Sequence, residues 1–299
     1  MLKLICPNIN VFDKSIIQKY KKYFRCKFYG NLSQSKFNKI SNNYDIILLR
    51  FSHFLKLKKD SKIKYILSPT TGLNHIDKKI INNSKIKIFH LNKKSFLKKI
   101  KASSEFTFYL ILATLRKIKN INQKNVIGTE LNGKLVGVIG LGRIGNNVAN
   151  FCSSLNAKVI FYDNFIEKIN NKKVKRTSIN FLLKNSDLIV ICIPSTDKNF
   201  KFLNKKRIDL IKKGGILINT SRGEIIDEEY VINLAKKKYL FYSSDVIQNE
   251  QFIKKNYYLK MNKNSNLLIT SHLAGMTEES IYKTDKEIFK IFLSYYEKN

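Results

Sequence analysis

The chain contains few of the residues and segments that mark secreted or membrane-bound proteins. Its 299 residues include three prolines and no tryptophan. No stretch approaches the roughly 18 consecutive apolar residues of a membrane-spanning helix, and the first ten residues turn polar too soon for a secretory signal peptide. We therefore expect a cytoplasmic protein without a membrane partner.

Cysteine is also scarce, and its spacing excludes two structural roles. The four cysteines are far apart and form no CxxC pair, which argues against both a disulfide framework and a zinc site. We expect reduced thiols and no bound metal. Two of them, Cys152 and Cys192, lie in apolar runs and are expected to pack as small core residues.

Acidic residues are few, so the chain carries a large positive charge. There are 22 acidic residues against 56 Lys and Arg, which gives a formal net charge of +34. Arginine occurs at only seven positions, and the lysines are scattered along the chain. Because clustering rather than total charge marks a binding face, we favour solvated surface lysines and no nucleic-acid partner. Binding to DNA with a steep salt dependence would support the alternative.

Short apolar runs alternate with longer helix-like segments along nearly the whole chain. This alternation is typical of parallel sheets covered by helices. A first series of strands is predicted at Leu2–Cys6, Cys26–Tyr29, Asp45–Phe51, Tyr65–Leu67 and Ile86–His90. A second series is predicted at Leu135–Ile139, Lys158–Tyr162, Leu188–Ile193, Gly215–Asn219, Phe241–Val246 and Leu267–Thr270. Helices are predicted at Phe96–Ile118 and Thr277–Asn299, with a polar connection at Asn120–Gly133.

The strongest local motif is a glycine-rich turn between a predicted strand and a predicted helix. Gly140, Gly142 and Gly145 form a GxGxxG pattern, with Arg143 and Ile144 inside it. The first glycine permits the tight turn, the second lets the backbone approach a pyrophosphate, and the third allows close packing of helix on strand. The helix N-terminus then offers free N–H groups to the phosphates.

An acidic residue follows at the spacing that dinucleotide binding requires. The next predicted strand is followed by Asp163, about 20 residues after the glycines, where a carboxylate can bond the ribose hydroxyls. No arginine follows it directly, since the next residues are Asn164 and Phe165. Asp163 would repel a 2′-phosphate, so the sequence favours NAD over NADP.

Three polar segments follow later strands of the second series, at the strand ends where open α/β sheets bind ligands. They are Ile218–Glu224, Ser244–Val246 with Glu250 just after it, and Thr270–Gly275. Histidine titrates in the range that a general acid/base needs. A neighbouring carboxylate favours imidazolium, and arginine presents a planar fork that can bind a carboxylate.

With these segments, nearly the whole chain resembles the D-isomer-specific 2-hydroxyacid dehydrogenases. The resemblance implies that Arg222 holds the substrate carboxylate and carbonyl, that His272 is the general acid/base and that Glu250 pairs with it. It also implies that Asp245 contacts the nicotinamide carboxamide. The motifs that carry the resemblance are Thr71–Asp77, Ser104–Thr107, the glycine-rich turn, Cys192–Pro194, Asn219–Asp227, Asp245-Val246, and the segments around Glu250 and His272.

The resemblance extends to further contacts. It implies that backbone N–H groups around Gly72 and Leu73 hold the substrate carboxylate, and that Pro194 and Thr220 contact the cofactor. Arg50, which ends an apolar run, is a candidate to reach the substrate from the other domain. The chain departs from the family at four positions, with Phe106 and Cys192 where histidine is usual, and Gln251 and Ser271 where proline is usual.

We therefore predict an α/β fold of two doubly wound parallel-sheet domains. A Rossmann NAD-binding domain, residues 99–275, is inserted in a flavodoxin-like substrate domain formed by residues 1–98 and 276–299. The predicted function is hydride transfer between NAD(H) and a small D-2-hydroxy acid or 2-oxo acid, in a homodimer. The alternative is a non-enzymatic NAD-sensing protein of the corepressor type, which turnover of a 2-oxo acid with NADH would exclude.

Overall fold

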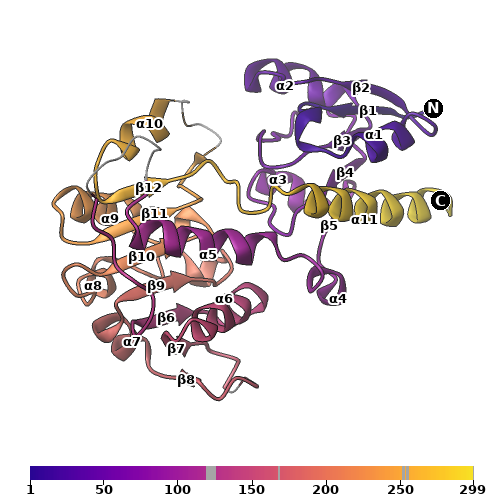
Figure 1. Ribbon diagram of the computed structural model, residues 1–299. Helices are drawn as coiled ribbons and strands as arrows, with labels where there is room; N and C mark the ends of the chain where they lie inside the picture. The colour runs from indigo at the N-terminus through magenta and orange to yellow at the C-terminus, as the bar shows by residue number, and fades with distance from the viewer. Residues whose placement is uncertain (119–125, 168, 251–252, 254–255, 299) are drawn as a thin grey trace. The chain divides into compact units, whose positions relative to one another are not determined.

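The computed structural model describes residues 1–118, 126–167, 169–250, 253 and 256–298. The chain divides into two compact units (Figure 1). The first unit comprises Met1–Ile100 and Met276–Asn299, and the second comprises Lys101–Gly275. The predicted connection at Asn120–Gly133 lies in part outside the described residues, and residues 126–133 form neither helix nor strand.

The first unit is built on a five-stranded parallel sheet with the order β2-β1-β3-β4-β5. Its strands are β1 (Lys3–Cys6), β2 (Arg25–Phe28), β3 (Ile46–Leu48), β4 (Tyr65–Ser68) and β5 (Lys87–His90). Its helices are α1 (Lys14–Tyr20), α2 (Gln34–Ile40), α3 (Lys78–Ile81), α4 (Lys94–Leu97) and α11 (Glu278–Tyr296).

Side chains alternate between the two faces of this sheet, so the unit has one apolar core on each face. In β1, Leu4 faces a cluster that includes Ile16 of α1 and Phe292 of α11, whereas Ile5 faces a cluster that includes Phe37 of α2. Successive side chains of a strand point to opposite faces, so both faces of the sheet must be covered. The C-terminal helix α11 supplies part of that cover, which places the end of the chain in the first unit.

The second unit has a seven-stranded parallel sheet with the order β12-β11-β10-β9-β6-β7-β8. Its strands are β6 (Leu135–Ile139), β7 (Lys158–Tyr162), β8 (Val174–Arg176), β9 (Leu188–Ile191), β10 (Ile216–Asn219), β11 (Phe241–Ser244) and β12 (Leu267–Ile269). Its helices are α5 (Ala102–Leu115), α6 (Arg143–Ser154), α7 (Ile179–Asn185), α8 (Lys205–Ile208), α9 (Glu228–Lys236) and α10 (Asn256–Asn262).

Helices cover both faces of this sheet. One apolar cluster contains residues of α5 and α6, and the other contains residues of α7, α8 and α9. The chain runs outward from β6 through β7 to β8, then returns to β9 on the other side of β6. Such a reversal of strand order creates a crevice outside the carboxyl ends of the strands, here those of β6 and β9, where ligands bind in doubly wound sheets.

Two sequence predictions about elements need correction. The six strands predicted for the second series omit β8, a three-residue edge strand in which Lys175 and Arg176 are exposed. The helix predicted at Phe96–Ile118 is interrupted between α4 and α5, because the chain passes from the first unit to the second after Ile100. Among the described residues, no helix is long and apolar enough to cross a membrane.

Candidate functional site

The glycine-rich turn joins β6 to α6 in a geometry that only glycine permits. Gly140 has a φ of +91°, which L side chains rarely adopt. A Cβ on Gly145 would lie 2.0 Å from the carbonyl oxygen of Gly140, so the helix can approach the strand only without a side chain there. Gly142 is the N-cap of α6 and has open space around its Cα. The first-turn N–H groups of α6 are therefore not covered by a capping side chain.

Asp163, directly after β7, is bound to the same turn. Its Oδ2 accepts a hydrogen bond from the backbone N–H of Leu141 at 2.7 Å. Its Oδ1 accepts from the N–H groups of Phe165 and Ile166 at 2.8 and 2.9 Å. The carboxylate thus fixes the end of β7 against the glycine-rich turn, at the position where the sequence predicts a contact with ribose.

The other residues predicted to contact the cofactor have unequal exposure. Arg143 and Ile144, in the first turn of α6, are half-buried, and burial lowers the pKa of Arg143. Pro194, which follows β9, is exposed. Thr220, which follows β10, is buried, and its hydroxyl bonds that of Thr107 in α5 at 2.7 Å. The Thr220 side chain is therefore committed to packing α5 on the sheet, which leaves its backbone for any contact with a ligand.

Arg222 lies in a loop that Asn219 holds in shape. The Asn219 side chain donates to the carbonyl oxygen of Arg222 at 2.9 Å and accepts from the N–H of Ser221 at 3.0 Å. Arg222 itself is half-buried. Burial lowers the pKa of Arg222, and the carboxylates of Glu250 and Glu224 oppose this shift. The arginine therefore lies in a region of two carboxylates, one of them the predicted partner of the histidine.

Glu250 and His272 form a direct pair. Oε1 of Glu250 lies 2.6 Å from Nδ1 of His272, and the two side chains are 20% and 15% exposed. The second carboxylate oxygen of Glu250 is buried without a hydrogen-bond partner among the described residues. His272 has a φ of +57°, an uncommon conformation for a residue other than glycine. The strand ends thus place a half-buried imidazole with one ring nitrogen fixed by a carboxylate.

Asp245 explains how the histidine loop is held in this conformation. Its Oδ1 accepts from the N–H of Leu273 and the hydroxyl of Thr270, its Oδ2 accepts from the N–H of Ala274, and its carbonyl accepts from the N–H of His272. Burial raises the pKa of Asp245, while these hydrogen bonds to its side chain oppose the rise. The sequence predicts a nicotinamide contact for this side chain, but the structure directs it into the His272 loop.

Sequence reasoning missed a second support, beneath the loop of Glu250. Glu228, the first residue of α9, accepts from the backbone N–H of Gln248 at 2.9 Å. Gln248 in turn donates from its side chain to the carbonyl oxygen of Ile226. A Cβ on Gly223 would lie 2.3 Å from the nitrogen of Gln248, so glycine is required there. The only sequence signal was the acidic run 227–229, which predicts a helix N-terminus.

In the first unit, the loop after β4 carries the two backbone N–H groups that the sequence assigns to the substrate. The hydroxyl of Thr70 donates to the carbonyl oxygen of Gly72 at 2.8 Å, and the N–H of Leu91 donates to the carbonyl oxygen of Thr70. Within the described chain, the backbone N–H groups of Gly72 and Leu73 make no hydrogen bond. These two donors, which the sequence assigns to the substrate carboxylate, are therefore available.

Arg50 has a different environment from the one that the sequence predicts. It is buried, and its Nη2 bonds Asp285 of α11 at 2.7 Å and Thr284 at 2.8 Å. Its Nη1 donates to the carbonyl oxygen of Pro69, and its guanidinium lies 5.2 Å from the ring centre of Phe12. This ion pair within the first unit gives Arg50 a structural role, and its predicted substrate contact stays a prediction.

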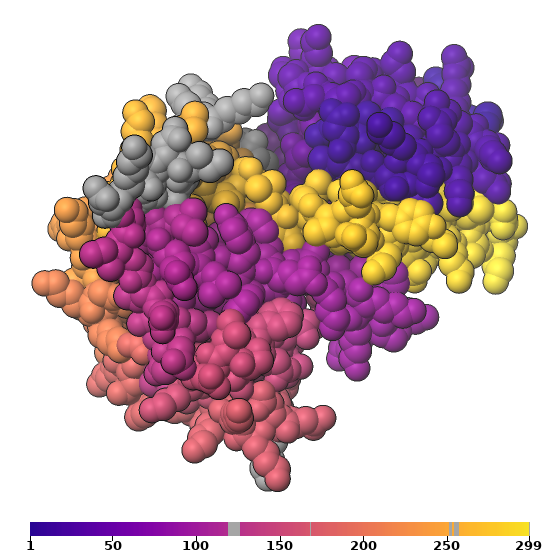
Figure 2. All heavy atoms as spheres, viewed as in Figure 1, coloured from indigo at the N-terminus to yellow at the C-terminus, as the bar shows by residue number. Residues whose placement is uncertain are grey.

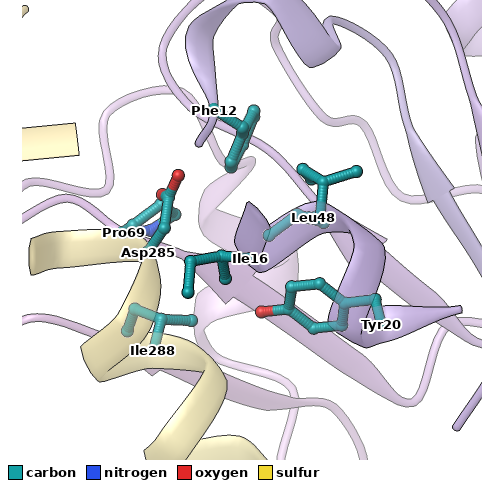
Figure 3. Close-up of a pocket in the computed structure, with 8 residues that line it drawn as sticks. Phe12, Ile16, Tyr20, Leu48, Pro69, Asp285 and Ile288 are labelled. Carbon is teal, nitrogen blue, oxygen red and sulfur yellow. The ribbon is translucent and has the colours of Figure 1, made fainter. Parts of the chain in front are cut away.

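The surroundings of that ion pair are apolar. Figure 3 shows Asp285 among the residues that line a pocket of the first unit. The pocket is too small to hold a water molecule. Burial raises the pKa of Asp285 to about 6, although the positive charge of Arg50 opposes the shift. The pocket is lined by Phe12, Ile16, Ile17, Tyr20, Leu48, Pro69, Asp285 and Ile288.

The doubly wound sheet, the glycine-rich turn and Asp163 together define a dinucleotide-binding domain. Residues 108–274 match the sequence profile of the D-isomer specific 2-hydroxyacid dehydrogenase, NAD binding domain. This match covers more than half of the chain, and the chain therefore belongs to the D-isomer specific 2-hydroxyacid dehydrogenase family. The family, the α/β fold class and the NAD cofactor predicted from the sequence are confirmed.

Individual relatives agree with this membership. The chain is 33% identical to D-3-phosphoglycerate dehydrogenase of Archaeoglobus fulgidus over 60% of this chain, but spans only 36% of that protein. It is 30% identical to 2-hydroxyacid dehydrogenase homolog 2 of Schizosaccharomyces pombe, with coverage of 76% and 74%. A solved D-lactate dehydrogenase from Aquifex aeolicus, complexed with NAD and lactic acid, is 25% identical, with a TM-score of 0.79 and coverage of 99% and 95%. Family and relatives make this chain an NAD-dependent oxidoreductase.

Proposed function

We propose that this chain transfers a hydride between NAD(H) and carbon 2 of a small D-2-hydroxy acid or 2-oxo acid. The observation that carries the proposal is the 2.6 Å contact between Nδ1 of His272 and Oε1 of Glu250. This contact positions His272 as an acid/base in the second unit, which also carries the glycine-rich turn. Relatives include proteins described as glyoxylate reductase, from Thermofilum pendens, and aromatic 2-oxoacid reductase, from Clostridium sporogenes.

The proposed mechanism assigns a proton to a specific atom. Because Glu250 holds Nδ1, Nε2 of His272 is the ring nitrogen that exchanges a proton with the substrate oxygen. In the reductive direction NADH, when bound, would supply the hydride, and the imidazolium would donate its Nε2 proton to the carbonyl oxygen. Arg222 binds the carboxylate and carbonyl of the 2-oxo acid through its planar fork.

Cofactor binding is assigned to the turn at Gly140–Gly145, with Asp163 at the adenosine ribose. The N-terminus of α6 has no capping side chain and suits a pyrophosphate, because backbone N–H groups and the helix dipole both favour negative charge. Asp163 favours NAD(H), since its carboxylate repels a 2′-phosphate. Pro194 and the backbone of Thr220, just after β9 and β10, are also assigned to binding of the cofactor.

We further propose that the protein is a cytoplasmic homodimer that binds neither nucleic acid nor membranes. Helix α5 supports the dimer, because it exposes Tyr109 and Leu112 at 53% and 36% while its other apolar side chains are packed. Figure 2 shows part of α5 on the surface of the second unit. The free cysteines support a reducing compartment. Gel filtration with light scattering tests the dimer.

The test of function combines a substrate screen with one variant. A panel of 2-oxo acids is offered with NADH, and absorbance of NADH reports turnover. His272→Ala should bind NADH as the wild type does, while turnover falls by roughly 10²–10⁴-fold, the usual contribution of a general acid/base. NADH binding without turnover of any acid by the wild type would favour the non-enzymatic sensor, and near-native turnover in the variant would refute the role of His272.

A further inference from the structure

The edge strand β8 brings a second charged residue to the cofactor turn. Arg176, the last residue of β8, pairs in register with Phe161 of β7. Its Nη2 donates to the backbone carbonyl oxygen of Asp163 at 3.0 Å. Its Nη1 lies 3.4 Å from Oε1 of Glu167. A guanidinium therefore lies at the residue whose side chain is assigned to the adenosine ribose.

The anchor of Arg176 does not depend on the Asp163 carboxylate. That carboxylate accepts from the N–H groups of Leu141, Phe165 and Ile166, whereas Arg176 bonds the backbone oxygen of the same residue. Replacing the Asp163 side chain would therefore leave the arginine in place. The pair with Glu167 is loose, since the two side chains are 41% and 76% exposed, and exposed pairs contribute little.

We propose that Arg176 is a second determinant of cofactor specificity. Its guanidinium is positioned to bind the 2′-phosphate of NADP(H), and the Asp163 carboxylate alone prevents this contact. The inference rests on the proposed placement of the ribose beside Asp163. Arginine suits this ligand because its planar fork binds phosphate through two parallel hydrogen bonds. With the aspartate removed, an arginine is already present, and no second substitution is needed.

This inference changes what the sequence alone implies about cofactor choice. In the sequence, an arginine is sought directly after the acidic residue, where Asn164 and Phe165 stand. The cation instead comes from the neighbouring strand, 13 residues later. An arginine engineered at position 164 would also displace a contact, because the Asn164 side chain accepts from the hydroxyl of Tyr162 at 2.6 Å.

The experiment measures binding rather than turnover, so it stays informative if the catalytic proposal fails. Affinities for NADH and NADPH are measured by fluorescence for Asp163→Ser alone and combined with Arg176→Gln or Lys175→Gln. Lys175 is the matched control, because it is the preceding exposed residue of β8 and carries the same charge. Adenosine 2′,5′-bisphosphate and ADP, measured by calorimetry, separate the 2′-phosphate from the nicotinamide half.

Asp163→Ser should gain at least about 10-fold in affinity for NADPH, the size of one charge-assisted contact. Adding Arg176→Gln should remove most of the gain and leave only the effect of removing the Asp163 charge, whereas adding Lys175→Gln should retain most of it. The proposal is overturned if Asp163→Ser gains nothing while remaining folded, or if both double variants bind NADPH equally well. If the wild type binds neither NADH nor NADPH, the proposed cofactor site is wrong. This result is distinct from a failure of the Arg176 proposal.

Discussion

Glu228 is a buried carboxylate whose ionisation should make the stability of the protein depend on pH. It is 7% exposed, and only one of its oxygens has a partner, the N–H of Gln248. The other oxygen is buried without a hydrogen bond among the described residues. Burial raises the pKa of Glu228 from 4.5 to about 7, and the carboxylates of Glu224 and Glu250 add to the rise. Replacing Glu228 by Gln removes the charge and keeps an acceptor for Gln248.

The direction of the effect follows from the two pKa values of Glu228. Its pKa is higher in the folded chain than in the unfolded chain, so the protonated carboxyl favours folding. That contribution is fully present below about pH 4.5 and is lost as the pH rises through about 7. The difference between the two pKa values corresponds to about 3 kcal/mol in the free energy of unfolding. Most of this loss falls between pH 5 and pH 8.

The assay is urea unfolding of wild type and variant at several pH values between 5 and 8. The free energy of unfolding of Glu228→Gln, relative to wild type, should rise by about 2–3 kcal/mol over this range. Glu229→Gln is the matched control, because Glu229 is the next residue of α9 and is exposed. Its difference from wild type should stay flat. Parallel curves for the two variants would refute the assignment of a raised pKa to Glu228.

Two further predictions test the ion pairs of the two units. Glu250→Gln should lower the rate of reduction, measured by NADH absorbance, by less than the roughly 10²–10⁴-fold loss expected for His272→Ala, because glutamine keeps the shape of the side chain without its charge; an unchanged rate would mean that Glu250 does not act on His272. Asp285→Asn should lower the free energy of unfolding by about 3–5 kcal/mol, because Arg50 would remain buried without its counter-ion. The double replacement of Arg50→Met with Asp285→Leu should restore much of this stability. If the double variant unfolds in urea as easily as Asp285→Asn, the ion-pair explanation is contradicted.

The sheets could be predicted from sequence because their strands are nearly continuous apolar runs between turns. Strands β6 and β7 have the bounds that the sequence predicts, Leu135–Ile139 and Lys158–Tyr162. Parallel strands that are buried on both faces carry this signal strongly. Strand β8 has three residues, two of them charged and exposed, so it shows neither an apolar run nor an alternation. Its position at the edge of the sheet could be known only from the fold.

The glycine-rich turn could be predicted because its chemistry is local. Gly140 and Gly145 are required by contacts with residues a few positions away or on adjoining strands. Arg50 shows the opposite case. Its partner Asp285 lies 235 residues later, on α11, and no local pattern reveals that a helix returning to the first unit brings a carboxylate to this arginine. The strand-end position of Arg50 therefore predicts a ligand contact but gives no sign of the structural ion pair that the fold supplies.

The type of a residue also does not show which neighbours its side chain contacts. Asp245 follows β11 at a ligand-binding strand end, yet its carboxylate accepts hydrogen bonds from the segment that carries His272. The positive φ of His272 costs free energy, and these bonds offset that cost while they aim the imidazole at Glu250. On the Glu250 side of the pair, Glu228 holds the loop in place by accepting a hydrogen bond from the N–H of Gln248. Two buried acids that never need to touch a substrate thus fix the distance on which the proposed proton transfer depends.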